Sequence, residues 1–176
     1  TILKNFENLN NSYSNNEKKN IIKNMWGNYG RIFAEYMYLE KFRNNVLSGN
    51  IEINGQKILD EIISKKEPVI FVSGHFNNFE LMAMHLEKSG INLAAIYRPL
   101  NNKFLNPLME KIRKKYICKN QIKKGIAGTK EILRYFKEDT SIALMIDQRV
   151  SEGILSNFFK QKALTTTIPA QLVKKF

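Results

Sequence analysis

The sequence is poor in the residues that build disulfides and metal clusters. Of its 176 residues, one is a cysteine, Cys118, and two are histidines. A single thiol excludes an internal disulfide and a zinc site made of several cysteines, and it is typical of a reducing compartment. The sequence also lacks the ligand spacings of metal sites and the glycine-rich loop that cradles phosphates. We therefore expect neither a metal nor a cofactor.

Long apolar runs are missing as well. No stretch approaches the roughly 18 apolar residues of a membrane span, and no signal peptide is evident. The chain begins at Thr1 and stops at Phe176, inside a pattern typical of a helix. We interpret residues 1–176 as a single domain that is a piece of a longer protein.

Acidic residues are scarce, with 16 Asp and Glu against 28 Lys and Arg, which gives a net charge of +12. This excess predicts attraction to an anionic partner: nucleic acid, a phosphorylated lipid, an acidic protein or an anionic membrane surface. The basic tract at residues 111–124 is either a solvated helix face or a docking surface for such a partner. Charge alone does not choose among them.

Hydrophobic periodicity predicts alternating strands and helices. Strands are expected at residues 69–72, 91–97 and 141–146, with an edge strand at 46–53, and helices at 20–42, 58–63, 78–89, 102–116 and 129–137. This alternation indicates an α/β fold with a mixed, largely parallel sheet flanked by helices. The aromatic stripe of the first helix, which includes Trp26, Tyr29 and Phe33, either packs in the core or partly faces a membrane or lipid chain.

A histidine and a carboxylate follow the first buried strand. His75 comes directly after Ser73-Gly74, and Glu80 lies five residues later, in the first part of the next helix. A carboxylate there can fix the tautomer of the imidazole and favour its protonated form. We expect the two side chains to lie within about one hydrogen bond or one water of each other, as a general base and its orienting group. The second histidine, His85, sits among apolar helix positions and is interpreted as structural.

Charged side chains also follow the other two buried strands. Arg98 follows the second strand, and Asp147-Gln148-Arg149 follows the third. Because the carboxyl ends of parallel strands meet at one edge of a sheet, we expect these residues to share a cleft with His75. The guanidinium of Arg98 suits a phosphate or carboxylate, with a structural salt bridge as the alternative. Asp147 is either an orienting or substrate-binding group, or a residue that caps a helix or stabilises a loop.

Residues 74–80, Gly-His-Phe-Asn-Asn-Phe-Glu, resemble the H-x4-(D/E) block of the bacterial lipid A biosynthesis acyltransferases. These late lauroyl and myristoyl transferases are related to the glycerolipid acyltransferases. Further blocks are similar in the same order, at residues 28–35, 97–99, 146–149 and 158–166. Lys160 departs from the pattern, because the family usually has glycine after the paired phenylalanines.

The resemblance implies a glycerolipid-acyltransferase-like fold, incomplete at the C-terminus and without the family's N-terminal membrane anchor. It implies transfer of a fatty acyl chain from an acyl carrier protein thioester to a hydroxyl of a lipid A precursor, without a covalent acyl-enzyme. His75 would be the general base and Glu80 its partner, while Arg98, Asp147, Gln148 and Arg149 would bind substrate. The partners would be acyl carrier protein, a phosphorylated lipid acceptor and the membrane surface, at the cytoplasmic face of the bacterial inner membrane.

Other functions remain open at this point. The acceptor could be another glycolipid or a phospholipid. A basic nucleic-acid-binding domain would need exposed aromatic side chains among clustered cations, but most aromatic residues here fall on apolar faces, so we expect no nucleic-acid partner. A catalytically inactive scaffold is the third alternative, against which the retained His75 and Glu80 argue.

Overall fold

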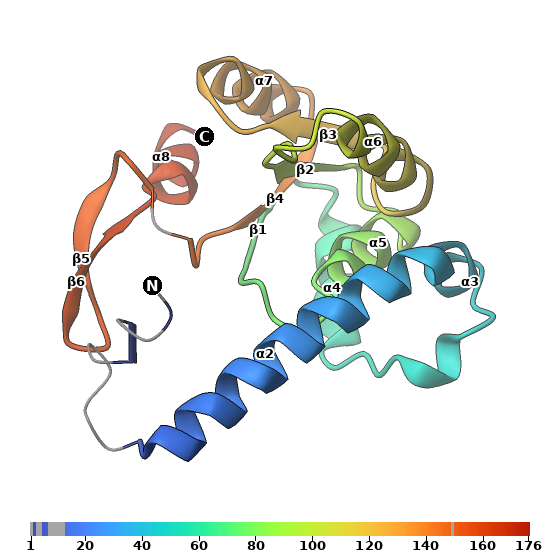
Figure 1. The fold of residues 1–176 in the computed structure, drawn as a ribbon. Helices are drawn as coiled ribbons and strands as arrows, with labels where there is room; N and C mark the ends of the chain where they lie inside the picture. The colour runs from blue at the N-terminus through green and yellow to red at the C-terminus, as the bar shows by residue number, and fades with distance from the viewer. Residues whose placement is uncertain (1, 3–4, 7–12, 149) are drawn as a thin grey trace.

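A computed structural model describes residues 2, 5–6, 13–148 and 150–176 (Figure 1). Helical segments precede β1, strands and helices then alternate as far as β4, and a hairpin and a final helix follow. The order is α2 (Asn15–Glu35), η1 (Tyr36–Tyr38), α3 (Leu39–Arg43), η2 (Ser48–Asn50), α4 (Gln56–Lys65), β1 (Ile70–Ser73), α5 (Glu80–Lys88), β2 (Leu93–Tyr97), α6 (Leu105–Tyr116), β3 (Asn120–Lys123), α7 (Ile126–Lys137), β4 (Ser141–Met145), β5 (Ile154–Phe158), β6 (Gln161–Thr165) and α8 (Ile168–Lys175).

Four strands form one parallel sheet in the order β1-β4-β2-β3. Val72 of β1 lies opposite Leu144 of β4, and Ala95 of β2 lies opposite Ala143. All four strands therefore end at the same edge of the sheet. The predicted α/β fold with a parallel sheet flanked by helices is confirmed.

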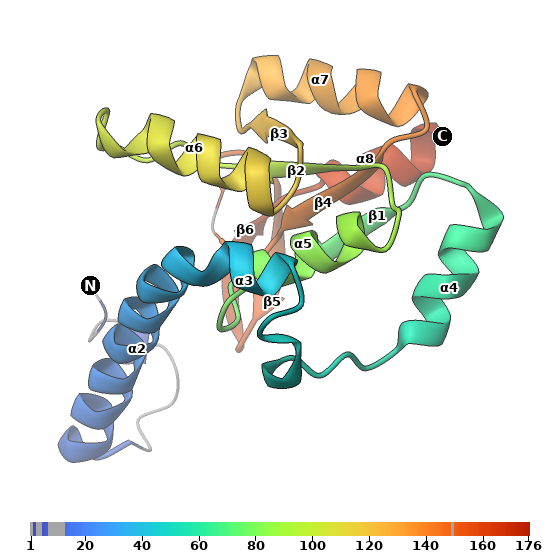
Figure 2. The same cartoon turned by 90° about the vertical axis from the view of Figure 1, so that its right-hand side faces the viewer.

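Helices cover both faces of this sheet. On β4, Ile142 and Leu144 pack toward Ile132 of α7 and Leu172 of α8, whereas Ala143 belongs to the cluster that α5 and α6 help to form. Side chains of a strand alternate between its faces, so an uninterrupted apolar run is buried only when both faces are covered. Figure 2 shows α5 and α7 on opposite sides of the strands.

One predicted element needs correction, and three strands were not predicted. The strand expected at residues 46–53 is wrong: this segment holds the short 3-10 helix η2, and Val46 is 68% exposed. Gly49 and its polar neighbours interrupt the alternation that a strand needs. Strand β3 and the antiparallel hairpin of β5 and β6 were not predicted, because each strand is only four or five residues long and mixes polar with apolar side chains.

Helix α2 begins with a capping box, in which the Ser14 hydroxyl accepts from the Glu17 backbone and the Glu17 side chain accepts from the Ser14 backbone. The helix predicted over residues 20–42 is interrupted by η1 and continues as α3. Its aromatic stripe is largely exposed, since Trp26, Tyr29 and Phe33 are 60%, 44% and 63% exposed, whereas Tyr36 packs against the core. Within the described ranges, none of the helices combines the length and apolar character required to cross a bilayer.

Candidate active site

His75 lies on the loop between β1 and α5, and its partner is Asp147. The His75 backbone N–H donates to Oδ2 of Asp147 at 2.7 Å, and ring atom Nδ1 lies 2.7 Å from Oδ1. Asn77 turns the loop with a φ of +45°, in the left-handed region that Asn tolerates. Since β1 and β4 are neighbours in the sheet, residues 72 positions apart in the sequence meet just beyond their ends.

The Asp147 carboxylate sets the tautomer of His75. An ionised carboxylate only accepts hydrogen bonds, so Nδ1 carries the proton and Nε2 is left as the acceptor. The side-chain amide nitrogen of Gln148 lies 3.5 Å from Nε2, and the Phe79 ring packs edge-on against the imidazole with centroids 4.7 Å apart. Burial alone would raise the pKa of the Asp147 carboxyl, but the hydrogen bonds from the His75 backbone and ring outweigh it and hold that pKa below its ordinary value.

Glu80 has different partners from those expected. Its carboxylate accepts hydrogen bonds from the Tyr36 hydroxyl and from Nε and Nη2 of Arg113, at 2.8 and 2.6 Å for the arginine, and Glu80 is only 7% exposed. Among the hydrogen bonds of the described residues, none joins Glu80 to His75. Burial and the neighbouring Glu80 charge raise the pKa of the Tyr36 hydroxyl. Although burial opposes it, Glu80 raises the pKa of the Arg113 guanidinium, so that the cation persists.

The C-terminal end of α2 holds the His75 loop at a second point. The side-chain amide of Asn78 donates to Oε2 of Glu35 at 2.6 Å. Beside it, Tyr36 contacts Glu80 at the first residue of α5. The loop that carries His75 is therefore fixed by Asp147, which follows β4, and by the end of α2 and the start of η1.

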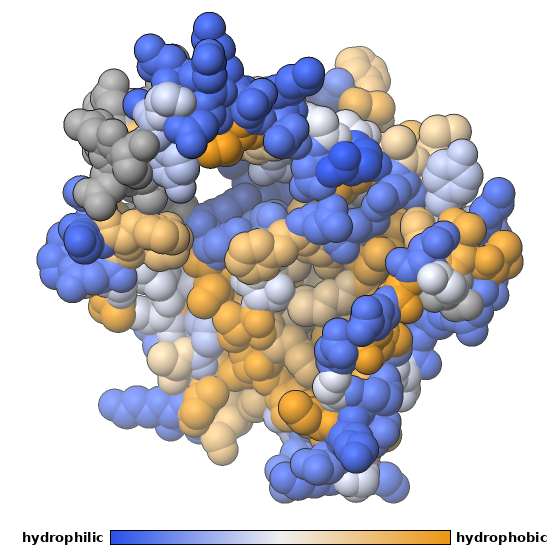
Figure 3. All heavy atoms as spheres, turned by 90° about the horizontal axis from the view of Figure 1, so that it is seen from below, coloured by the Kyte–Doolittle hydropathy of each residue, from blue (hydrophilic) through white to orange (hydrophobic). Residues whose placement is uncertain are grey.

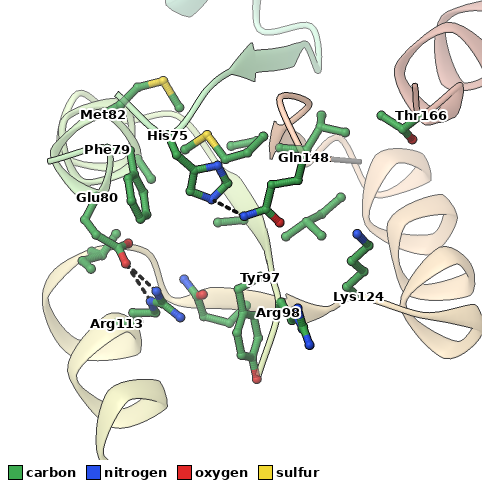
Figure 4. A pocket seen from close by; sticks show the side chains of 18 of the residues that line it. His75, Phe79, Glu80, Met82, Tyr97, Arg98, Arg113, Lys124, Gln148 and Thr166 are labelled. Carbon is green, nitrogen blue, oxygen red and sulfur yellow. Dashed lines mark hydrogen bonds and ion pairs between the residues drawn. The ribbon is translucent and has the colours of Figure 1, made fainter. Parts of the chain in front are cut away.

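A cleft of about 270 Å³ opens beside His75 (Figure 4). Apolar side chains line much of it, including Phe79, Met82, Ile96 and Met145, and its cations are Arg98, Arg113 and Lys124. Figure 4 shows His75 and Gln148 directed toward each other, and Glu80 directed toward Arg113.

The structure brings most of the predicted site residues to this cleft. His75, Glu80, Arg98 and Gln148 line it, and Asp147 contacts His75. Arg149 lies outside the described residues.

Sequence reasoning missed Tyr36, Arg113 and Lys124 as parts of the cleft and its supporting contacts. Arg113 did carry a signal: it lies four residues after Met109 and four before Ile117, so it falls on the apolar side of its helix. A cation in such a position calls for a buried partner. Tyr36 and Lys124 carried no comparable signal.

The second histidine has a different environment. In α5, His85 lies with Nε2 3.3 Å from Oε1 of the Gln56 side chain, and it is not among the described residues that line the cleft. Desolvation lowers its pKa. Nowhere in the described part of the chain do three or more His, Cys, Asp or Glu side chains gather in a way that could hold a metal ion.

The arrangement suits proton abstraction from a substrate that is both apolar and anionic. A carboxylate-held imidazole with an accepting Nε2 can act as a general base, while the apolar wall and the cations can bind hydrocarbon and phosphate or carboxylate groups. A family model described as bacterial lipid A biosynthesis acyltransferase matches residues 1–176. No curated protein matches the chain. Because the family model spans the whole sequence, the predicted family is confirmed, and the chain belongs to the bacterial lipid A biosynthesis acyltransferases.

Proposed function

We propose that the protein transfers a fatty acyl chain from an acyl carrier protein thioester to a hydroxyl of a lipid A precursor, with His75 as the general base. The observation that carries the proposal is the His75–Asp147 pair, which leaves Nε2 as an acceptor beside the cleft. The family supports the acyl transfer itself.

In the proposed reaction, Nε2 of His75 takes the proton of the acceptor hydroxyl while its oxygen attacks the thioester carbonyl carbon. The C–O bond forms, the tetrahedral oxyanion collapses, and the C–S bond breaks. The departing thiolate takes the proton back from the imidazolium. Asp147 stabilises that imidazolium through Nδ1, as an orienting carboxylate does in related hydrolytic sites.

The acyl group passes directly to the hydroxyl in this scheme, so no protein nucleophile is required. Cys118 is poorly suited to that role, because it is 1% exposed and burial raises the pKa of its thiol to about 11. We propose that Arg98 and Lys124 bind phosphate groups of the acceptor and that Gln148 helps to place the hydroxyl near Nε2.

Glu80 takes a supporting role in this proposal. Its contacts with Arg113 and Tyr36 fix one wall of the cleft, whereas Asp147 holds the imidazole. The two carboxylates near His75 thus serve different functions because they have different partners.

We further propose that the enzyme works at the cytoplasmic face of the bacterial inner membrane, on a phosphorylated lipid acceptor. The net charge of +12 favours both an acidic carrier protein and an anionic lipid surface.

The test is an acyl-transfer assay of the full-length protein with acyl carrier protein thioester and a lipid A precursor, with a glycolipid and a phospholipid acceptor in parallel. The variant His75→Gln should lose on the order of 10²–10⁴-fold in turnover. His85→Gln is the matched control, because it replaces the other histidine outside the cleft, and it should keep near-normal turnover. Near-normal turnover by His75→Gln would overturn the mechanism, and transfer to another acceptor alone would change the proposed substrate.

A further inference from the structure

Helix α2 exposes a continuous apolar stripe that no described residue covers. Trp26, Tyr29, Phe33 and Met37 follow at intervals of three, four and four residues, which places them on one side of the helix and its extension η1. They are 60%, 44%, 63% and 83% exposed. A side chain such as Met37 or Phe33 is costly to leave in water, at about 1.5–3 kcal/mol relative to burial. We therefore expect another molecule or surface to cover the stripe.

Cations outnumber acids beside this stripe. Residues 18–34 hold four cations, Lys18, Lys19, Lys23 and Arg31, and no acidic residue. Glu17 and Glu35 flank this cationic segment, Glu35 is bound by Asn78, and Glu40 lies three residues after Met37. Lys23 and Lys19 lie three and seven residues before Trp26, on the same side of the helix. Figure 3 views the molecule from below and shows that apolar side chains are exposed near the middle of this face, with hydrophilic side chains toward its rim.

We propose that the exposed stripe of α2 docks onto an anionic lipid bilayer, with the helix lying in the plane of the interface. A helix with Trp and Phe on one side and Lys or Arg beside them is typical of interfacial membrane binding, and Trp and Tyr favour the depth of the lipid headgroups. The proposal rests on the proposed function only for the identity of the membrane, since the binding requires neither donor nor acceptor.

The docked helix is tied to the site. Glu35, at the end of α2, holds Asn78 in the loop that follows His75, and Tyr36, at the start of η1, holds Glu80 at the first residue of α5. Seating the stripe on a bilayer therefore fixes the position of the His75 loop relative to the lipid surface. A membrane-resident acceptor would then meet the cleft at a defined height.

The single tryptophan of the chain makes the proposal directly testable, because Trp26 lies in the stripe. The full-length protein and its Trp26→Phe variant are each mixed with vesicles of anionic phospholipid that contain no donor or acceptor, so that the difference between their emission spectra reports on Trp26. Trp26 emission should shift to the blue, and brominated acyl chains should quench it. Phe33→Ser and Met37→Ser should each lower the vesicle partition coefficient roughly tenfold. Ile58→Ser, which replaces a 64% exposed apolar residue on α4, should leave it unchanged.

Three results would overturn the docking proposal. The first is binding to vesicles with unchanged Trp26 emission, which would mean that another face docks. The second is equal binding of Phe33→Ser and Ile58→Ser. The third is a vesicle-free dimer that Phe33→Ser dissociates, which would assign the stripe to a second copy. Vesicle binding by the inactive His75→Gln variant separates this proposal from the catalytic one, since either can fail while the other holds.

Discussion

At the scale of single residues, the two carboxylates nearest His75 differ in what surrounds them. Asp147 keeps a side chain that is 33% exposed and accepts both the ring and the backbone N–H of His75. Glu80 is buried and neutralised by Arg113. A carboxylate that must support a transient imidazolium is best left ionised and in contact with the ring, whereas a buried carboxylate paired with arginine serves mainly to hold structure. The following predictions separate these roles.

Replacing Asp147 by Asn should remove catalysis while largely preserving the fold. The amide keeps the shape of the side chain, but it can present Nδ2 to the ring and so favour the tautomer with the proton on Nε2, where the base must accept. We expect acyl transfer to fall on the order of 10²–10⁴-fold in turnover. Asp139→Asn is the control, because Asp139 has a φ of +53° that Asn also tolerates. Equal activity of the two variants would contradict the role of Asp147.

The same substitution should change how stability depends on pH. The folded protein holds the pKa of Asp147 below its ordinary value, so the ionised form contributes to stability above the unfolded pKa of about 3.9. That contribution is lost as the pH falls through the lower folded pKa. Urea unfolding at several pH values between about 6 and 2 should therefore show a smaller loss of stability on acidification for Asp147→Asn than for the wild type. Parallel curves would contradict the pKa assignment.

Glu80→Gln should act mainly on stability. It removes the negative charge opposite Arg113, which is partly buried, and breaking a buried pair costs up to about 3–5 kcal/mol in the free energy of unfolding. Tyr36→Phe removes one hydroxyl from the same cluster and should cost about 1 kcal/mol. Denaturant unfolding followed by circular dichroism would measure both changes in the free energy of unfolding. If Glu80→Gln unfolds like the wild type and yet abolishes acyl transfer, Glu80 acts on His75, as first expected from their spacing.

At the scale of elements, the sequence predicted the segments that are strongly apolar. Strands β2 and β4 are largely apolar and are covered on both faces, and β1, at the edge of the sheet, is an apolar run that is partly covered. Strand β3 reads Asn-Gln-Ile-Lys, with one apolar side chain, so only its pairing with β2 reveals it. The segment at residues 46–53 has strand-like composition but finds no neighbouring strand in the described structure. Pairing depends on long-range contacts, which local pattern cannot supply.

Helix α7 packs so closely on β3 that it requires glycine at one position. A Cβ atom on Gly128 would lie 1.9 Å from the Lys123 carbonyl oxygen, a backbone atom. Gly128→Ala should therefore destabilise the protein by about 1–3 kcal/mol or more, since the helix must move away from the strand. The matched control is Gly27→Ala in the middle of α2, where a Cβ would meet nothing within 4 Å. There alanine should stabilise by about 0.5–1 kcal/mol. Urea unfolding measures both, and equal shifts would contradict the packing.

At the scale of the whole molecule, topology determines which residues meet. The sequence predicted that His75, Arg98 and Asp147 follow strands, and parallel strand order brought them to one edge. It could not predict the carboxylate that contacts His75, because Glu80 is five residues away in the sequence and Asp147 is 72. Spacing favoured the nearer one. Asp147 contacts His75 because β1 and β4 are neighbours in the sheet, and no local sequence pattern predicts which strands are neighbours.

The exposed lysines of α6 lead to a prediction about where the proposed acyl donor docks. Helix α6 lines the cleft with Arg113 and presents Lys111, Lys114 and Lys115 to solvent, and the net charge is +12. The proposed donor, an acidic acyl carrier protein, should be steered to this side of the cleft. On that proposal, Lys114→Glu should raise KM for the carrier-bound thioester severalfold with kcat little changed. Lys57→Glu on α4 makes the same change of charge on a helix that contributes no residue to the described lining of the cleft, and it should have a smaller effect. Added salt should raise the KM of the wild-type enzyme toward that of Lys114→Glu, because salt at 0.1 M screens exposed charges that are more than about 10 Å apart. If the two variants show equal KM and equal salt dependence, the carrier docks elsewhere, and the basic face of α6 is simply solvated.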